Sequence, residues 1–587
     1  MKKLFVYLKD YTKECVLGPL FKMLEVFFEL LVPLVVASII DVGIADGDRA
    51  YIARRFLLLA ALAFMGVACS ISAQYFAARA SVGFAKRVRS ALFRHIQTLS
   101  HAELDKLGVP TLVSRITGDT NQVQTGLNLT LRLLLRSPVV VAGATVMAFL
   151  VDFGAGCIFL AVIFVLALVI FAIMKICVPL YRDIQARLDG VMGKVKENLS
   201  GARVIRAFAM EGQETEKFRS QTGGLLQIQQ KTSHISVLLN PMTYVIVNLA
   251  VIVLIWTGAL RVQAGLLTQG AVVALCNYMS QILVELIKLA DLIVNIARAI
   301  ACGRRIEAVF EIKPSVSSSA APENGLDIEI VAESEILVEF EDVGLRYGGA
   351  GADAVFGVSF AARRGETIGI IGGTGSGKTS LVGLIPRFYD ATGGQVRIGG
   401  VDIQQYPLGR LRDRIGFVSQ QVELFKGTIR DNVHWGKWDA TDGEIFCALE
   451  IAQALDFVYE NEGDGKAGGL DAAIEQGGKN LSGGQRQRLA IARALIKKPD
   501  ILIFDDSSSA LDYATDAAFR AALRRVSGQC AVFVVSQRAS SIRDADRIIV
   551  LEKGAVVGNG THQELLENCA VYREIYGTQF QKGGSQT

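Results

Sequence analysis

The chain has 587 residues, more than a single hydrophobic core usually organises, so at least two domains are expected. Hydrophobic residues make up 51% of the sequence and the mean hydropathy is +0.37, which excludes an ordinary soluble protein. Charged residues make up 20%, which excludes a chain buried wholly in lipid. The net charge of +4 is not concentrated in one tract, so it gives no support to nucleic-acid binding. A membrane-embedded half joined to a water-soluble half fits these values.

The nine cysteines are scattered, with no pair at CxxC spacing and no histidine cluster at metal-ligand spacing. We expect buried, reduced thiols rather than a disulfide framework or a zinc site. The N-terminal segment carries Lys2, Lys3, Lys9 and Lys13 before any long apolar core, and no small-residue cleavage site follows. It is therefore predicted to be a retained amphipathic helix on the membrane surface.

Four apolar stretches are long enough to cross the hydrocarbon core, which takes about 20 helical residues. They are residues 56–78, a run around 138–151 that extends further on its N-terminal side, 154–174 and 235–260. Two further stretches, 17–40 and 271–300, are similarly long but carry charges. These charges are Lys22, Glu25 and Glu29 in the first and Glu285, Lys288 and Asp291 in the second. The sequence therefore predicts six spans.

The charges within these two stretches recur at helical spacing. Lys22, Glu25 and Glu29 lie within about 60° of helix arc, and the three charges of the second stretch lie within about 120°. Ionised side chains facing lipid are expensive, so we expect both sets to face an aqueous cavity. Alternatively, they sit near the cytoplasmic interface and pair within their own helix, which fits Lys22 and Asp291 better than Glu29 and Glu285.

Basic residues concentrate at the N-terminus and in the connections after the second and fourth predicted spans, residues 79–128 and 175–234. By the positive-inside rule, the N-terminus and both connections are predicted to be cytoplasmic. Both connections carry apolar residues at helical spacing, so we expect helices that extend beyond the bilayer and can reach a cytoplasmic domain.

After residue 300 the long apolar runs stop, and the segment EIKPSVSSSAAPENG is typical of a linker. From about Leu337, short β-branched runs alternate with helical patterns, which predicts an α/β domain with a largely parallel sheet. The predicted organisation is a transmembrane domain of six α-helical spans at 1–310, a linker at 311–336, the α/β domain at 337–580 and a flexible tail at 581–587.

A glycine-rich loop follows the β-branched run TIGIIG and precedes a helical pattern. It matches the phosphate-loop pattern GxxxxGK followed by Ser or Thr. In such a loop, backbone N–H groups surround the phosphates of ATP, Lys378 neutralises charge and Thr379 offers its hydroxyl to Mg²⁺. The residues predicted to bind nucleotide here are Gly372, Gly373, Thr374, Gly375, Ser376, Gly377, Lys378, Thr379 and Ser380.

The apolar run ILIFD ends in Asp505, where a second group that holds Mg²⁺ is expected, at the sheet edge beside the phosphate loop. Buried strands that end in Asp are common, so this interpretation depends on the phosphate loop in the same domain. Together the two motifs predict a domain that binds ATP and Mg²⁺.

Between these motifs stands LSGGQ, followed by RQRLAIARAL, and here the sequence resembles the ATP-binding-cassette family. The resemblance implies that Ser482, Gly484 and Gln485 belong to a signature that contacts ATP. It extends to Tyr347 as the aromatic ring that stacks on adenine, and to Gln420 as a glutamine that touches Mg²⁺ and senses the transmembrane domain. It also marks a loop at the dimer contact, formed by Ser509, Ala510, Leu511 and Asp512.

The membrane half is similar to the exporter branch of that family at residues 105–124 and 197–208, so the resemblance covers nearly the whole chain. It implies a dimer in which cytoplasmic extensions of the spans end in coupling helices pressed onto the nucleotide domains. It also implies that each of two ATP molecules lies between one subunit's phosphate loop and the other's LSGGQ. The implied partners are the lipid bilayer, a small-molecule substrate and a second half-transporter.

Two positions depart from the family's pattern, and both concern hydrolysis. The family places Glu after Asp505 to polarise the attacking water, whereas this chain has Asp506, whose carboxylate is withdrawn by about 1.5 Å. The family has His in a later strand-end loop, whereas this chain has Gln537, which carries no titratable charge. The two changes together resemble the degenerate half of heterodimeric exporters.

Asp506 and Gln537 are therefore assigned to a slow catalytic site. Because LSGGQ is intact and works in trans, we expect this chain to complete an active site on a different partner that has Glu and His at these positions. The alternative is a homodimer with two slow sites.

The sequence as a whole predicts ATP-driven efflux of amphipathic or hydrophobic compounds, multidrug-like or lipid-like, across the plasma membrane. A peptide exporter is one alternative, although the version that processes its cargo is weakened because no peptidase domain precedes the first span. Another is an ATP-gated channel or a regulatory membrane protein. Uphill accumulation in sealed vesicles distinguishes a pump from a channel.

Overall fold

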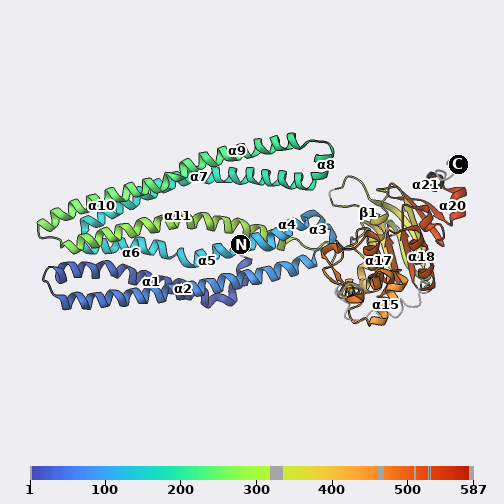
Figure 1. Ribbon diagram of the computed structural model, residues 1–587, viewed down its shortest axis with the longest axis horizontal. Coiled ribbons are helices and arrows are strands. Elements are labelled where there is room, and N and C mark those ends of the chain that lie inside the picture. Colours follow the sequence, from blue (N-terminus) through green and yellow to red (C-terminus); the bar gives the residue numbers. More distant parts are fainter. Residues whose placement is uncertain are drawn as a thin grey trace. The chain divides into compact units, whose positions relative to one another are not determined.

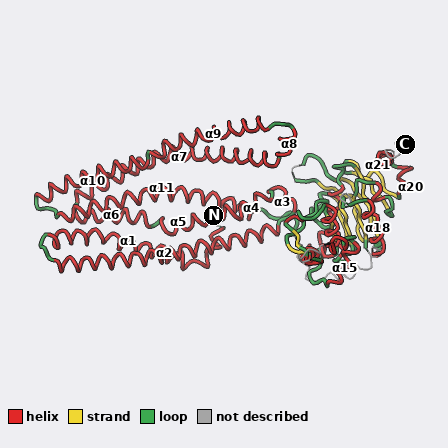
Figure 2. Tube along the Cα trace, viewed as in Figure 1, coloured by secondary structure: helices red, strands yellow, loops and turns green. Residues whose placement is uncertain are grey.

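The computed structural model of the protein describes residues 3–317, 335–348, 350–460, 468–507, 511–526, 528 and 530–580. The chain divides into two compact units, one of Met1–Ile96 with Pro110–Glu311 and one of Gln97–Val109 with Ile312–Thr587. Figures 1 and 2 show long helices in the first unit and both helices and strands in the second. Residues 318–334 of the predicted linker and the predicted tail at 581–587 lie outside the described residues.

The first unit is a bundle of long helical stretches, some made of two or more successive helices, that alternate in direction along the chain (Figure 1). Its elements are η1 (Leu4–Tyr11), α1 (Thr12–Ser38), η2 (Ile39–Ile44), α2 (Arg49–Thr98), α4 (Val109–Ser114), η3 (Arg115–Asp119), α5 (Thr120–Leu133), α6 (Arg136–Val151), α7 (Phe153–Ser200), α8 (Ala202–Ala207), α9 (Glu211–Val237), α10 (Leu239–Gln263) and α11 (Gln269–Glu311). Helix α2 has 50 residues and α7 has 48. At about 1.5 Å per residue, both are longer than the ~30 Å hydrocarbon core requires, as the long connections predict.

Among the described residues, five helical stretches are long and apolar enough to cross a membrane. They contain five of the predicted spans and are Leu4–Ile44, Arg49–Thr98, Val109–Val151, Phe153–Ser200 and Glu211–Gln263. The sixth predicted span lies within α11, which has 43 residues but carries Glu285, Lys288 and Asp291. The protein is therefore a multi-pass membrane protein by its helices.

The core of the bundle lies among α1, α6, α7, α10 and α11. Phe159, Leu166 and Tyr278 are fully buried there, and the small residues Ala144 and Ala148 let the helices approach closely. Many large apolar side chains outside this core remain exposed, Phe164 and Trp256 among them. An apolar exterior around a packed interior suits a bundle surrounded by lipid.

Among the described residues, the second unit combines a six-stranded sheet, a four-stranded sheet and a two-stranded sheet with short helices. Its main strands are β1 (Ile336–Leu345), β2 (Val355–Arg363), β3 (Thr367–Gly372), β4 (Gly393–Ile398), β5 (Val401–Asp402), β6 (Ile415–Val418), β9 (Ile501–Asp505), β10 (Ala531–Val535), β11 (Arg547–Glu552) and β12 (Ala555–Gly560), and β7 (Gly427–Thr428) pairs with β8 (Ala473–Ile474). Its helices are α3 (His101–Leu107), α12 (Lys378–Leu384), α13 (Leu408–Asp413), α14 (Ile429–His434), α15 (Asp442–Ile451), α16 (Leu455–Glu460), α17 (Gly483–Leu495), α18 (Tyr513–Val526), α19 (Ala539–Ile542), α20 (His562–Asn568) and α21 (Ala570–Phe580).

The larger sheet has the strand order β12-β11-β3-β10-β9-β6, and every pair in it is parallel except β11 with β12. This confirms the predicted α/β domain with a largely parallel sheet. Strands β3, β9 and β10 are nearly continuous apolar runs because both faces of the sheet are covered. Since these three strands are adjacent and parallel, the segments that follow them emerge at one edge, where open α/β sheets bind ligands.

Helix α3 belongs to the second unit, although its sequence lies between helices of the first. A capping box formed by Ser100 and Glu103 begins the helix. The ring of His101 lies 4.5 Å from that of Phe388, and the Tyr389 hydroxyl donates to Asp105 Oδ2 at 2.9 Å. These contacts hold α3 against the segment that follows α12.

Candidate functional site

The glycine-rich loop between β3 and α12 needs its glycines for backbone reasons. Gly375 and Gly377 have φ angles of +80° and +94°, in the left-handed region that side chains disfavour. A Cβ on Gly377 would also lie 2.4 Å from the carbonyl oxygen of Ala354. The backbone can therefore curl into the start of α12, whose N–H groups are directed at the concavity of the loop.

Lys378, the first residue of α12, is buried and folded back on this loop. Its Nζ donates to the carbonyl oxygens of Gly372 at 2.9 Å and Gly373 at 2.8 Å. Burial lowers the pKa of Lys378, and the charges of Asp506 and Asp505 oppose that shift. A positive charge held inside a ring of backbone dipoles is suited to neutralising phosphate oxygens.

Oxygen atoms suited to a magnesium ion stand beside the loop. The Thr379 hydroxyl donates to Asp505 Oδ1 at 3.0 Å, and Asp505, the last residue of β9, is 2% exposed. Burial raises the pKa of Asp505, whereas the hydrogen bond from Thr379 and the charge of Lys378 lower it in part. A hydroxyl, a carboxylate and the side-chain amide of Gln420 are the hard oxygen ligands that Mg²⁺ prefers, so the residues present fit the ion.

A cavity of about 350 Å³ brings the sequence-predicted residues together. Its walls are formed by Tyr347, Ala354, Thr374, Gly375, Gly377, Lys378, Thr379, Ser380, Gln420, Asp505, Asp506, Val535 and Gln537. Gly372, Gly373 and Ser376 shape the loop without bordering the cavity. Ala354 and Val535 were not predicted, because an apolar wall residue leaves no mark in the sequence.

The ring of Tyr347 is held by two contacts. Its hydroxyl donates to Ser380 Oγ at 2.8 Å, and its ring meets that of Tyr389 at right angles, with 5.0 Å between the centroids. An aromatic ring fixed at the edge of the cavity can stack on a purine base.

Asp506 and Gln537 lie in the same cavity, at the ends of β9 and β10. Asp506 has a φ of +47°, and its N–H donates to the carbonyl oxygen of Val535 at 3.0 Å. Burial raises the pKa of Asp506, and the charges of Lys378 and Arg538 lower it in part. Gln537 Oε1 accepts from the Thr374 hydroxyl at 3.5 Å, so the amide reaches the phosphate loop.

The signature residues lie elsewhere in this unit. Ser482 Oγ accepts from Gln485 N at 3.2 Å and Gln485 Oε1 accepts from Ser482 N at 2.9 Å, a capping box that begins α17. Ser482, Gly484 and Gln485 are not among the residues that border the described cavity. Of the predicted dimer-contact loop, Ser509 and Ala510 lie outside the described residues.

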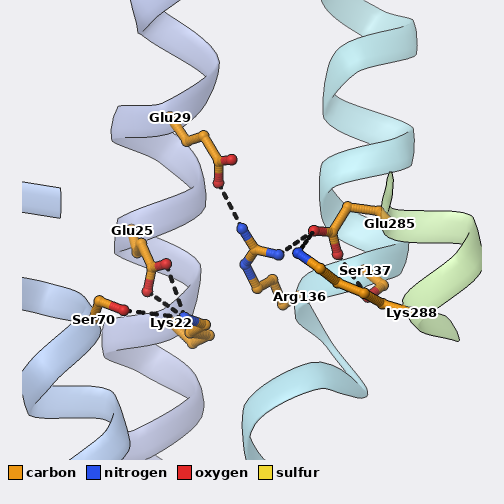
Figure 3. Close-up of polar contacts among 8 residues, drawn as sticks. All are labelled: Lys22, Glu25, Glu29, Ser70, Arg136, Ser137, Glu285 and Lys288. Atoms are coloured by element: carbon orange, nitrogen blue, oxygen red, sulfur yellow. Dashed lines mark hydrogen bonds and ion pairs between the residues drawn. The ribbon is translucent and has the colours of Figure 1, made fainter. Parts of the chain in front are cut away.

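The charges within the spans form an ionic cluster of Glu29, Arg136, Glu285 and Lys288 (Figure 3). Glu29, Glu285 and Lys288 border a cavity in the first unit, whereas Lys22, Glu25 and Asp291 do not. Lys22 instead binds Glu25 within its own helix, with 2.6 Å between Nζ and Oε2, as the alternative prediction had it for Lys22. Arg136, at the centre of the cluster, was missed, although a single arginine beside an apolar run is a signal in itself.

Comparisons with known proteins find matches for both units. A model of the ABC transporter transmembrane region matches residues 15–286, and a model of the ABC transporter matches residues 355–509. An uncharacterized ABC transporter ATP-binding protein of Mycobacterium tuberculosis is 35% identical over 576 residues, which cover 98% of this chain and 97% of the relative. An ATP-dependent lipid A-core flippase of Vibrio vulnificus is 28% identical over 585 residues, which cover 99% and 98% of the two chains.

A solved structure shares the fold of the whole chain. It is a bacterial Atm1-family ABC exporter with ATP bound, with a TM-score of 0.80, 24% sequence identity and 98% of each chain covered. The likeness extends across both the helical unit and the α/β unit.

Proposed function

Because the chain belongs to the ABC transporter family, we propose that it drives the efflux of amphipathic or hydrophobic compounds, multidrug-like or lipid-like. The chain is an ABC exporter with fused transmembrane and ATP-binding domains, and its ATPase is coupled to transport. A lipid-like cargo is supported by relatives named lipid A-core flippases. The plasma membrane, with the N-terminus and the ATP-binding domain in the cytoplasm, is the proposed location, supported by the basic connections.

The observation that carries the nucleotide part of the proposal is the cavity between the phosphate loop and β9. Tyr347 would stack on the base, the loop from Gly372 to Ser380 would hold the phosphates, and Lys378 would neutralise their charge. Thr379, Gln420 and Asp505 would hold Mg²⁺, which supplies further charge neutralisation when bound.

Among the described residues that line the cavity, the proposed general base is Asp506, a carboxylate one methylene shorter than the family's Glu. Asp506 follows Asp505 at the position where the family has Glu. Gln537 offers an amide where the family has a titratable histidine. A positioned general base contributes about 10²- to 10⁴-fold to a rate, so a site with a shortened carboxylate is expected to turn over slowly. We infer a partner chain with Glu and His at these positions, for which the present chain supplies the intact signature at the start of α17.

The test is a pair of substitutions in the complex purified with its partner. Gly484→Glu places a charged side chain where the partner's γ-phosphate would approach, and it should abolish fast ATP hydrolysis. Asp506→Ala should lower the rate much less, because the local site is already slow. A brisk ATPase from the isolated chain, or equal losses in the two variants, would refute the heterodimer.

A further inference from the structure

A cavity lies beside the ionic cluster, in the unit whose helices cross the membrane. Its lining is nevertheless mostly polar. The cavity measures about 280 Å³ and lies between α1 and α11. Its walls are formed by Glu29, Asn277, Ser280, Gln281, Val284, Glu285 and Lys288, of which only Val284 is apolar. Polar groups within a span are expensive and mark functional positions, so this cavity calls for an occupant.

The inner charges of the cluster pair with one another, and only the buried Nε of Arg136 has no hydrogen-bond partner among these atoms of the described residues. Figure 3 shows Arg136 between Glu29 and Glu285, and one guanidinium nitrogen donates to each. Glu285 also accepts from the Ser137 hydroxyl at 2.8 Å and from Lys288 Nζ at 2.9 Å. With three donors and 3% exposure, Glu285 is fully engaged and serves as an anchor for the cluster.

The outer groups of the cavity retain open acceptors. Glu29 gives only Oε2 to Arg136, at 2.8 Å, and its side chain is 38% exposed. Gln281 Oε1 is buried and has no hydrogen-bond partner among the described residues. Asn277 and Ser280 donate to backbone carbonyl oxygens of their own helix, which leaves their oxygens as acceptors.

A buried acceptor without a partner is costly, and a carboxylate with one open oxygen attracts a cation. Lys288, the one cation among the described residues of the wall, is already bound to Glu285. We propose that this cavity binds the protonated amine of an amphipathic cargo, with Glu29 as its counter-ion and Gln281 as a hydrogen-bond acceptor. This inference rests on the proposed export function and names its substrate class.

The size of the cavity fits a head group rather than a whole cargo. Sites that enclose drug-sized ligands measure about 300–1,000 Å³, so 280 Å³ suits an ammonium group with a few carbon atoms. The apolar part of the cargo would stay outside, against the apolar surface of the helices.

The test uses dansylcadaverine, an aromatic probe with a primary amine, its neutral N-acetyl derivative and the carboxylate analogue dansyl-aminohexanoate. Dissociation constants are measured by fluorescence on the full-length chain in lipid nanodiscs. The amine should bind at least about tenfold more tightly than either analogue.

Glu29→Gln should weaken amine binding by about tenfold and leave binding of the neutral derivative unchanged. Glu29→Asp should restore part of the loss. Gln281→Leu should weaken amine binding by a smaller factor than Glu29→Gln does.

The matched control is Glu25→Gln, the same substitution on the same helix, where the carboxylate binds Lys22 and does not border the cavity. Every variant is also checked for unchanged thermal unfolding and nucleotide binding. The proposal is overturned if Glu29→Gln leaves amine affinity unchanged, or if Glu25→Gln lowers it as much. It is also overturned if the carboxylate analogue binds best and is lost in Lys288→Gln, which would assign an anionic cargo.

A separate transport measurement distinguishes two outcomes: that the amine site is wrong, or that the proposed export function is wrong. Sealed vesicles that contain the chain and its partner are supplied with ATP and a panel of amphipathic compounds. Uphill accumulation of other compounds without preference for amines would overturn only the amine site. Absence of accumulation for every compound would overturn the export function as well.

Discussion

At the scale of single residues, Lys378 shows how one side chain can hold the phosphate loop together. Its ammonium group holds two carbonyl oxygens of the loop, and both bonds keep the loop curled before any phosphate arrives. Lys378 is 8% exposed, and burial lowers its pKa, whereas the charges of Asp506 and Asp505 oppose that shift.

Lys378→Ala should lower the affinity of this chain's own site for ATP by roughly 10- to 100-fold, because a hydrogen bond to a charged group is worth about 1.5–3 kcal/mol. Tyr347 remains to stack on the base, so binding should weaken rather than vanish. Titration with a fluorescent ATP analogue measures the effect. Lys426→Ala, which removes an exposed lysine of the same unit, should change nothing, and equal affinities in the two variants would disprove the assigned role.

The sequence predicts Lys378, Thr379 and Asp505 because a phosphate loop is encoded locally, in a strand, a loop and a helix that follow one another. Arg136 is different. Its partner Glu29 lies 107 residues away and Glu285 lies 149 residues away, so their meeting depends on the packing of three helices. No local pattern carries that information.

At the scale of elements, the loop between β3 and α12 contains one glycine that the backbone requires, Gly377, and another, Gly373, that a larger residue could replace. A Cβ on Gly377 meets the Ala354 carbonyl at 2.4 Å in a left-handed backbone, whereas a Cβ on Gly373 meets nothing within 4 Å. The pattern GxxxxGK likewise fixes glycine at position 377 and leaves position 373 open.

Gly377→Ala should therefore lower the thermal stability of the nucleotide-free protein by at least about 1 kcal/mol, from backbone strain and the clash together. Gly373→Ala should leave it within about 0.5 kcal/mol of the parent, as an unhindered substitution does. Thermal unfolding without nucleotide measures both. Equal destabilisation by the two variants would show that the loop is not strained as described.

The ionic cluster sets the stability of the spanning bundle at the junction of α1, α6 and α11. Arg136→Gln leaves two carboxylates without their shared cation, and breaking a buried ion pair costs about 3–5 kcal/mol. We expect a clear drop in unfolding temperature in detergent. Arg132→Gln, one turn earlier and without an ion pair among the described residues, is the control. A stable Arg136→Gln variant would mean that Lys288 alone neutralises Glu285.

The exact ends of the helices, rather than their extension beyond the bilayer, mark the limit of prediction for elements. Hydropathy identifies residues 56–78, yet α2 runs from Arg49 to Thr98, because its polar extensions keep the helical hydrogen bonds without being apolar. A hydropathy window detects the apolar segment of a helix that lies in lipid, but it does not detect where the helix ends.

At the scale of the whole molecule, the two departures at Asp506 and Gln537 can be reversed together. Asp506→Glu with Gln537→His should raise ATP turnover by the isolated chain by on the order of 10²-fold, the lower end of what a positioned base contributes. A steady-state phosphate-release assay measures it. Asp439→Glu, the same change at an exposed position, should have no effect. If the double variant stays slow, the low rate has its origin outside these two positions.

The placement of α3 limits how freely such chains can be recombined. The chain crosses between its two units three times, at Ile96, at Val109 and at Glu311, because α3 folds with the second unit. A chimaera joined only at residues 311–336 would set a foreign α3 against Phe388 and Tyr389, and Asp105 and its partner hydroxyl would come from different parents. Residues 97–109 and the C-terminal unit are therefore expected to work only when both come from the same parent.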